Sequence, residues 1–205
     1  MIHARKPGTR IGARTIRARL ERSATGFVLS ALLLVAFTGA PLWATVQPGD
    51  TAPLFTLKDR NDGEVSLEDF RGKVVLLNLV GYACQPCIED AASVEAIWQD
   101  FQGQEFQALA LDFWNGTVSD VQFFVDQTGV SFPVLRDAAF LSLQSQYGLG
   151  FDNFVVIDAD GIVRYTSENE AFDPFNDQAI RQTIQQFLPT AVQQVNWTTI
   201  KGRFR

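Results

Sequence analysis

The chain is poor in the side chains that most often bind metal ions. Its 205 residues include two cysteines, Cys84 and Cys87, and a single histidine, His3, near the N-terminus. A structural zinc site needs about four ligands, usually Cys or His, so the sequence argues against a self-contained zinc site and against a copper site. Internal repeats, low-complexity tracts, a P-loop and a Rossmann fingerprint are also missing. We therefore predict no metal and no bound cofactor.

Positive charge is outnumbered by negative charge over most of the chain. Residues 1–23 contain seven Lys and Arg against one Glu, which leaves ten basic and twenty-two acidic residues, a net charge of −12, in the remainder. Binding to nucleic acid depends on basic side chains that neutralise phosphates. The acidic body therefore argues against a nucleic-acid partner.

Charge of either sign is missing between residues 23 and 49, where the sequence includes GFVLSALLLVAF. A basic segment followed by an apolar run is typical of an export signal or a membrane anchor. The strongest apolar part, residues 27–37, has the length of a signal core, and Ala44 ends a candidate cleavage site. Extended over residues 24–46, the run could instead anchor the chain by spanning a membrane. In either case the basic end stays in the cytoplasm, which predicts a periplasmic or otherwise extracytoplasmic and oxidising location for the rest.

The remaining sequence alternates strand and helix patterns. The run VVLLNLV, residues 74–80, has the continuous apolar character of a central strand that is buried on both faces. Further strands are expected at 106–113 and 132–135, a hairpin at 55–67 around Asn61-Asp62-Gly63, a second hairpin at 153–167, and helices at 86–101, 118–129, 138–148 and 177–188. This order predicts an α/β domain over residues 47–189, with a largely parallel sheet covered on both faces. Residues 1–46 form the export or anchor segment, and the tail 190–205 has no assignment.

Both cysteines lie in CQPC, where the first core strand passes into a helix. At a helix N-terminus, free backbone N–H groups and the helix dipole stabilise a thiolate, so Cys84 is the expected nucleophile. Cys87, one turn later and more buried, is placed to attack the mixed disulfide, and Gln85 and Pro86 between them should tune the redox potential. A purely structural disulfide is the main alternative, but a four-residue ring contributes only about 2 kcal/mol by the loop-entropy estimate.

The stretch TAPLFTLKDRNDGEVSLEDFRGKVVLLNLVGYACQPC, together with FPVLRD and FVVIDADGIVRY, resembles the TlpA/ResA type of exported thiol–disulfide oxidoreductases within the redoxin (AhpC/TSA) superfamily. The resemblance covers about residues 50–166. It implies a thioredoxin-like fold, a central mixed sheet flanked by helices with an N-terminal β-hairpin added. It also implies that Cys84 attacks and Cys87 resolves, that protein disulfides or dithiols are substrates, and that a membrane donor supplies electrons. An acidic residue three positions after the second cysteine, here Asp90, would assist proton transfer, although Asp90 reads equally well as a solvated helix charge.

The chain departs from this family pattern at two places. Ala83 replaces the usual tryptophan before the first cysteine, and GLGFDNFVVID lacks the cis-proline that normally faces the cysteines. The matching positions are about Asp152 and Asn153, which we expect to face the substrate. A carboxylate of Asp152 near Cys84 would disfavour the thiolate. We therefore expect a reductant or weak exchanger of protein disulfides rather than a strong oxidant.

Two other functions remain open from the sequence. A peroxiredoxin-like peroxidase shares the fold, but the Pro-x-x-x-Thr-x-x-Cys pattern of such enzymes is absent here. A non-catalytic assembly or binding factor would be consistent with the two departures. Trp114 and Asn115 follow the C-terminal end of a strand, the side where α/β folds build sites. They are candidates to border the cysteine pair, although we expect an ordinary loop there.

Overall fold

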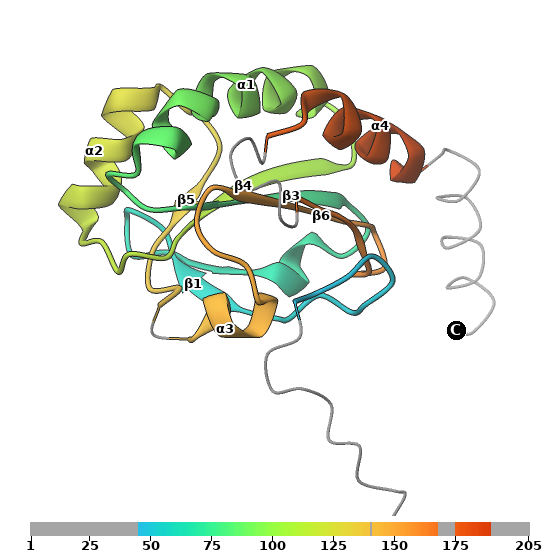
Figure 1. Cartoon of the computed structure of the whole chain (residues 1–205), viewed down its shortest axis with the longest axis horizontal. Helices are drawn as coiled ribbons and strands as arrows, with labels where there is room; N and C mark the ends of the chain where they lie inside the picture. The colour runs from blue at the N-terminus through green and yellow to red at the C-terminus, as the bar shows by residue number, and fades with distance from the viewer. Residues whose placement is uncertain (1–44, 140, 168–174, 190–205) are drawn as a thin grey trace, which may run out of the picture. The chain divides into compact units, whose positions relative to one another are not determined.

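The structure is a computed structural model that describes residues 45–139, 141–167 and 175–189 (Figure 1). All of these residues belong to one compact unit, Pro41–Arg205. The proposed export segment and the C-terminal tail lie outside the described residues, apart from Thr45 and Val46. Among the described residues, no helix combines the length and the apolarity needed to cross a membrane.

A five-stranded mixed sheet forms the centre of this unit, in the order β5-β4-β3-β6-β7. The elements β3 (Val74–Val80), β4 (Phe106–Asp112) and β5 (Val134–Leu135) are parallel. Two further strands, β6 (Asn153–Ile157) and β7 (Val163–Thr166), join in antiparallel orientation. All seven residues of β3 are buried, as its apolar run predicted. The sheet is therefore mixed, because β6 runs opposite to both of its neighbours, β3 and β7.

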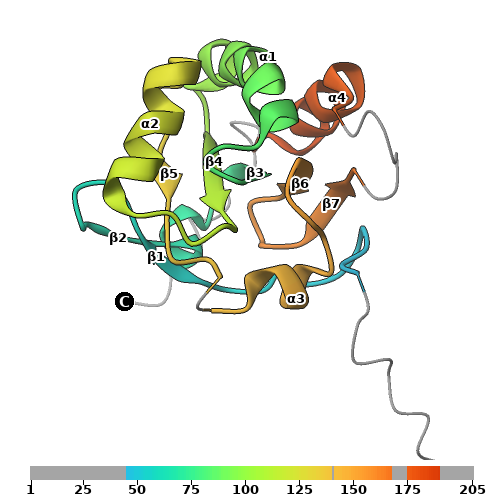
Figure 2. The ribbon, with the colours of Figure 1, turned by 60° about the vertical axis from the view of Figure 1, so that its left-hand side comes forward.

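Helices α1 (Gln85–Phe101), α2 (Val118–Thr128) and α4 (Asp177–Phe187) cover one face of the sheet (Figures 1 and 2). The other face is covered by the hairpin of β1 (Thr56–Lys58) and β2 (Glu64–Ser66), the 3-10 turn η1 (Leu67–Phe70) and the short helix α3 (Leu143–Tyr147). The predicted thioredoxin-like architecture with an added N-terminal hairpin is confirmed. The sheet thus separates two apolar cores, one beneath α1, α2 and α4 and the other beneath the hairpin, η1 and α3. Packing on both faces holds the sheet in place, and with it the strand ends next to the cysteine pair.

Two elements are shorter than the sequence predicted. The third helix spans five residues instead of 138–148, because Ser142, inside the predicted range and N-cap residue of α3, has a left-handed φ of 52°. Non-glycine residues enter that region at a cost, and the helix does not continue back through Ser142. The predicted strand 132–135 contributes only Val134 and Leu135 to the sheet.

Asn78 is a polar residue at the centre of β3. It is 1% exposed, and neither its amide nitrogen nor its amide oxygen has a hydrogen-bond partner among the described residues. An unsatisfied buried polar group costs about 1–3 kcal/mol. We therefore expect Asn78→Leu, a change of similar volume, to raise the free energy of unfolding by about 1 kcal/mol or more, measured by urea unfolding of the oxidised protein. A decrease would show that a partner outside the described residues satisfies the amide.

Candidate redox site

The cysteine pair lies where β3 passes into α1. The backbone N–H of Cys84 donates to the carbonyl oxygen of Gly81 at 2.9 Å, which closes a tight turn directly after the strand. Cys84 is the N-cap residue of α1, and Pro86 lies in the first turn, where a missing N–H costs little. The strand-to-helix position predicted from the sequence is confirmed.

The two cysteines form a disulfide, with their Cα atoms 5.3 Å apart. The Sγ of Cys84 accepts a hydrogen bond from the backbone N–H of Cys87 at 3.3 Å. This bond comes from one of the free N–H groups at the start of a helix, which favour negative charge on a cap atom. Once the disulfide is reduced, the same N–H is placed to stabilise a thiolate on Cys84.

Both cysteines are buried to a similar degree, with Cys84 2% and Cys87 1% exposed. Cys87 is the slightly more buried of the two in this oxidised state, by a margin too small to distinguish their roles. Gln85 and Pro86 between them are exposed, and the Gln85 amide donates to Glu89 at 2.9 Å. The motif thus presents its two central residues to solvent and turns its sulfur atoms inward.

Asp90 lies on α1, one turn beyond Cys87, and is half-buried. This is the spacing expected of a group that exchanges a proton with the Cys87 thiol. Its position is equally that of an ordinary helix charge, so its role remains a prediction.

The loop before β6 contains Asp152 and Asn153. Asp152 has a left-handed φ of 60°, and its N–H donates to the carbonyl oxygen of Leu79 at 2.6 Å. The Asn153 amide donates to the carbonyl oxygens of Gly150 and Phe151, and its oxygen accepts from the Ser167 hydroxyl. The loop is thus held to the end of β3 by its own backbone. The Asn153 side chain is used inside the loop, and contact of either residue with substrate remains a prediction.

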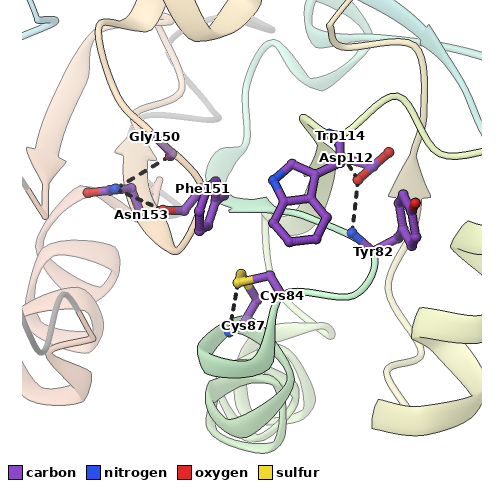
Figure 3. The surroundings of a disulfide bond; sticks show 8 residues. All are labelled: Tyr82, Cys84, Cys87, Asp112, Trp114, Gly150, Phe151 and Asn153. Atoms are coloured by element: carbon purple, nitrogen blue, oxygen red, sulfur yellow. Dashed lines mark hydrogen bonds between the residues drawn. A yellow bond between two sulfur atoms is a disulfide. The ribbon is translucent and has the colours of Figure 1, made fainter.

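The sequence placed Trp114 beside the cysteines only as the less favoured of two alternatives. This tryptophan lies in the loop after β4 that was expected to be ordinary, and Figure 3 shows it beside Phe151, with the disulfide sulfur atoms directed toward the two rings. Its ring makes edge contacts with Tyr82 and Phe151, at centroid distances of 5.8 and 5.2 Å. A Cβ atom on Gly81 would overlap the indole, so the glycine allows the ring to pack on the turn that precedes Cys84.

Asp112 connects this tryptophan loop to the cysteine loop. Its buried carboxylate accepts the backbone N–H groups of Tyr82 at 3.0 Å, Trp114 at 3.3 Å and Gly116 at 2.5 Å. Burial raises the pKa of the Asp112 carboxyl above its ordinary value of 3.8, and the charge of Asp120 adds to this, while the three N–H donors oppose it. One carboxylate therefore fixes the geometry of both loops.

This shifted pKa gives a pH-dependent stability. A carboxyl group whose pKa is raised by folding contributes stability below its unfolded pKa, and that contribution is lost as pH rises through the folded pKa. Relative to Asp112→Asn, the free energy of unfolding of the wild type should therefore fall as pH rises above 3.8. Urea unfolding of both proteins over a pH series measures the difference, and parallel curves would contradict the assignment.

Among the described residues, no group of three or more His, Cys, Asp or Glu side chains is arranged to hold a metal ion. The chemistry that the site offers is thus that of two sulfur atoms at a helix N-terminus. In an α/β domain of this topology, a cysteine pair at this junction is typical of the thioredoxin-like thiol–disulfide oxidoreductases, and this chain is one of them. It belongs to the AhpC/TSA family, whose model matches residues 48–166.

Curated relatives and solved structures agree with this assignment. The chain is 32% identical to the thiol-disulfide oxidoreductase ResA of Geobacillus thermodenitrificans, over 65% of this chain and 80% of that protein. It is 27% identical to the thioredoxin-like protein YneN of Bacillus subtilis, over 71% and 88% of the two chains. A crystal structure from Chlorobium tepidum, assigned as a thiol:disulfide interchange protein DsbE, has a TM-score of 0.61 at 26% identity, and the match covers 71% of this chain and 100% of that one. The resemblance to TlpA/ResA-type proteins predicted from the motifs is confirmed.

Proposed function

We propose that the protein works outside the cytoplasm as a reductant of protein disulfides, with Cys84 as attacking and Cys87 as resolving cysteine. The observation that carries this proposal is the Cys84–Cys87 disulfide at the N-terminus of α1, with an N–H group bonded to the Cys84 sulfur. The basic and apolar segment 1–46 supports delivery across a membrane, either as a cleaved signal or as an anchor through residues 24–46.

The reaction proceeds in two exchanges. In the reduced protein, the Cys84 thiolate attacks one sulfur of a substrate disulfide, and the other substrate sulfur leaves as a thiolate that takes a proton from water. The Cys87 thiol then loses its proton, for which Asp90, one turn further along α1, is the candidate acceptor, and attacks the Cys84 sulfur. The second substrate sulfur leaves, and Cys84 and Cys87 are joined. A dithiol donor, which we place in the membrane, returns two electrons and two protons to the pair.

The direction toward reduction is supported by the lack of a positively charged residue in the CQPC motif itself. The Cys84 sulfur accepts a hydrogen bond from a neutral backbone group, and the exposed residues of the motif, Gln85 and Pro86, carry no charge. A weakly stabilised thiolate makes the disulfide form less oxidising, because strong oxidants owe their potential to a stabilised reduced form. A carboxylate of Asp152 directed toward Cys84 would act in the same direction by disfavouring negative charge on its sulfur.

The proposal is tested by trapping. We expect Cys87→Ser, expressed with the full N-terminal segment, to accumulate mixed disulfides between Cys84 and cellular proteins in the extracytoplasmic fraction. The adducts should disappear with dithiothreitol and be absent from the Cys84→Ser/Cys87→Ser double variant. Absence of any adduct, together with normal cell function of the double variant, would favour a non-catalytic assembly or binding role. Rapid thiol-dependent consumption of peroxide by the wild type would favour the peroxiredoxin-like alternative.

A further inference from the structure

The two cysteines of the disulfide are buried, although the residues next to them in the motif are exposed. Cys84 and Cys87 are 2% and 1% exposed, whereas Ala83, Gln85 and Pro86 lie open to solvent. Side chains outside the motif must therefore shield the sulfur atoms. Figure 3 shows Trp114 and Phe151 on the side toward which the sulfur atoms point.

Neither ring is buried as a core aromatic would be. Trp114 is 41% and Phe151 43% exposed, so each presents apolar surface to solvent beside the reactive pair. Large exposed aromatic side chains at one place commonly mark a binding surface. The exposed residues of the cysteine motif and of the two aromatic loops are uncharged: Ala83, Gln85, Pro86, Trp114, Asn115 and Phe151. The exposed acidic residue Glu89 follows on α1 and accepts a hydrogen bond from Gln85, so the surface offered beside the two rings is apolar with an acidic neighbour on the helix.

Trp114 is held in a defined place. Its backbone N–H donates to Asp112 at 3.3 Å, the same carboxylate that accepts from Tyr82 in the cysteine loop. Its indole packs on Gly81, whose carbonyl oxygen accepts the N–H of Cys84. Aromatic pairs in edge contact contribute beyond their buried area, and Trp114 makes two of them. The indole is thus fixed relative to Cys84 through both backbone and ring contacts.

We propose that Trp114 is the specificity-determining residue of this redox site, shielding Cys84 from small thiols and binding an apolar side chain next to the reacting cysteine of the substrate. This inference rests on the proposed thiol–disulfide exchange at Cys84. The substrate class is an extended segment of a protein with a disulfide-bonded cysteine beside an apolar residue. When that residue contacts the indole, the substrate sulfur lies against Cys84, whereas a thiol without such a residue gains nothing from the contact.

The shielding of Cys84 by Trp114 is tested by measuring how fast a small thiol reduces the oxidised protein. Dithiothreitol thiolate attacks the Cys84 sulfur of the oxidised protein, the bond to Cys87 breaks, and the second dithiothreitol thiol closes to release both protein thiols. If the indole leaves the sulfur reachable about one tenth of the time, Trp114→Ala accelerates this reduction about tenfold. Trp114→Phe, which keeps an aromatic ring, should remain within about twofold of the wild type, since most of the cover is retained.

The recognition is tested in the other direction, with the reduced protein and two peptide disulfides that differ only in Leu or Asn beside the cysteine. We expect the wild type to react faster with the Leu peptide than with the Asn peptide. Trp114→Ala should lower the ratio of these two rates about fivefold, the size of effect seen when a side chain important for binding is removed from an interface. Retention of both the wild-type dithiothreitol rate and the wild-type preference in Trp114→Ala would overturn the inference. If the wild type reacts with neither peptide nor dithiothreitol, the proposed function itself fails.

A spectroscopic measurement keeps the inference testable if Trp114→Ala does not fold. A disulfide quenches the fluorescence of an indole in contact with it, so reduction of the wild type should raise the tryptophan emission. Trp98, eleven residues beyond Cys87 on α1 and so about 16 Å along the helix axis, serves as the matched control. The rise should persist in Trp98→Phe and be lost in Trp114→Phe. Persistence of the full rise in Trp114→Phe would show that the indole does not cover the sulfur atoms.

Discussion

Cys84→Ser is expected to lower the rate at which the protein reduces a peptide disulfide by about a thousandfold or more, because a serine hydroxyl is not ionised near neutral pH and cannot replace the attacking thiolate. Cys84 is the cysteine at the helix cap, with the Cys87 N–H bonded to its sulfur. The measurement is the rate of product thiol release under single-turnover conditions.

Cys87→Ser is the matched control for this variant. Both substitutions remove the same four-residue cross-link, worth about 2 kcal/mol, so a shared loss of stability cancels in the comparison. Cys87→Ser should still attack the peptide and stop at the mixed disulfide, releasing one thiol instead of two. If Cys84→Ser forms the adduct and Cys87→Ser does not, the assignment of the two roles is reversed.

Phe124→Ala is expected to lower the free energy of unfolding by about 3–5 kcal/mol, as for other buried phenylalanines. Phe124 is fully buried in the core that α1 and α2 form with the sheet, and this core also contains both cysteines. Its neighbour Phe123 on the same helix is 48% exposed. Phe123→Ala should therefore change the free energy by no more than about 0.5 kcal/mol.

Urea unfolding of the two variants, in the oxidised state, checks this prediction. The pair differs only in which side of α2 loses its ring, so helix propensity and composition are matched. Equal destabilisation by the two substitutions would mean that α2 does not pack on the sheet by the face that contains Val121 and Phe124.

The sequence was informative wherever one local pattern decided the structure. The apolar run of β3 could be buried only as a central strand, and Gly129 ends α2 with a φ of 69°, as a C-cap glycine does. The position of Cys84 at the cap of α1 follows from that strand and from Pro86 in the first turn. These elements needed no knowledge of distant contacts.

Trp114 could not be assigned in this way, because its role depends on two loops that are far apart in sequence. The register of β3 with β4 pairs Val80 with Asp112, which brings the two loops to the same edge of the sheet. A signal was present, since Trp114 and Asn115 follow the C-terminal end of a strand, the side where α/β folds build sites. What the sequence alone could not provide was the contact with Gly81, which exists only after the sheet has formed.

The same reasoning applies to the two departures from the family pattern. Ala83 is exposed and has no large side chain at the position before Cys84, and Trp114 and Phe151 lie instead on the side toward which the sulfur atoms point. The loop without proline is held by the bond from the Asp152 N–H to Leu79. Both replacements are long-range contacts, so the sequence could show what was missing but not what took its place.

The reduction potential of the Cys84–Cys87 pair tests the central claim most directly. It is measured by equilibrating the purified protein in glutathione buffers and quantifying the two thiols. For a reductant or weak exchanger we expect a value between about −300 and −180 mV, above that of inert structural disulfides and below that of strong oxidants. A value near −120 mV, typical of a strong oxidant, would contradict the account, as would a pair that stays oxidised in every buffer.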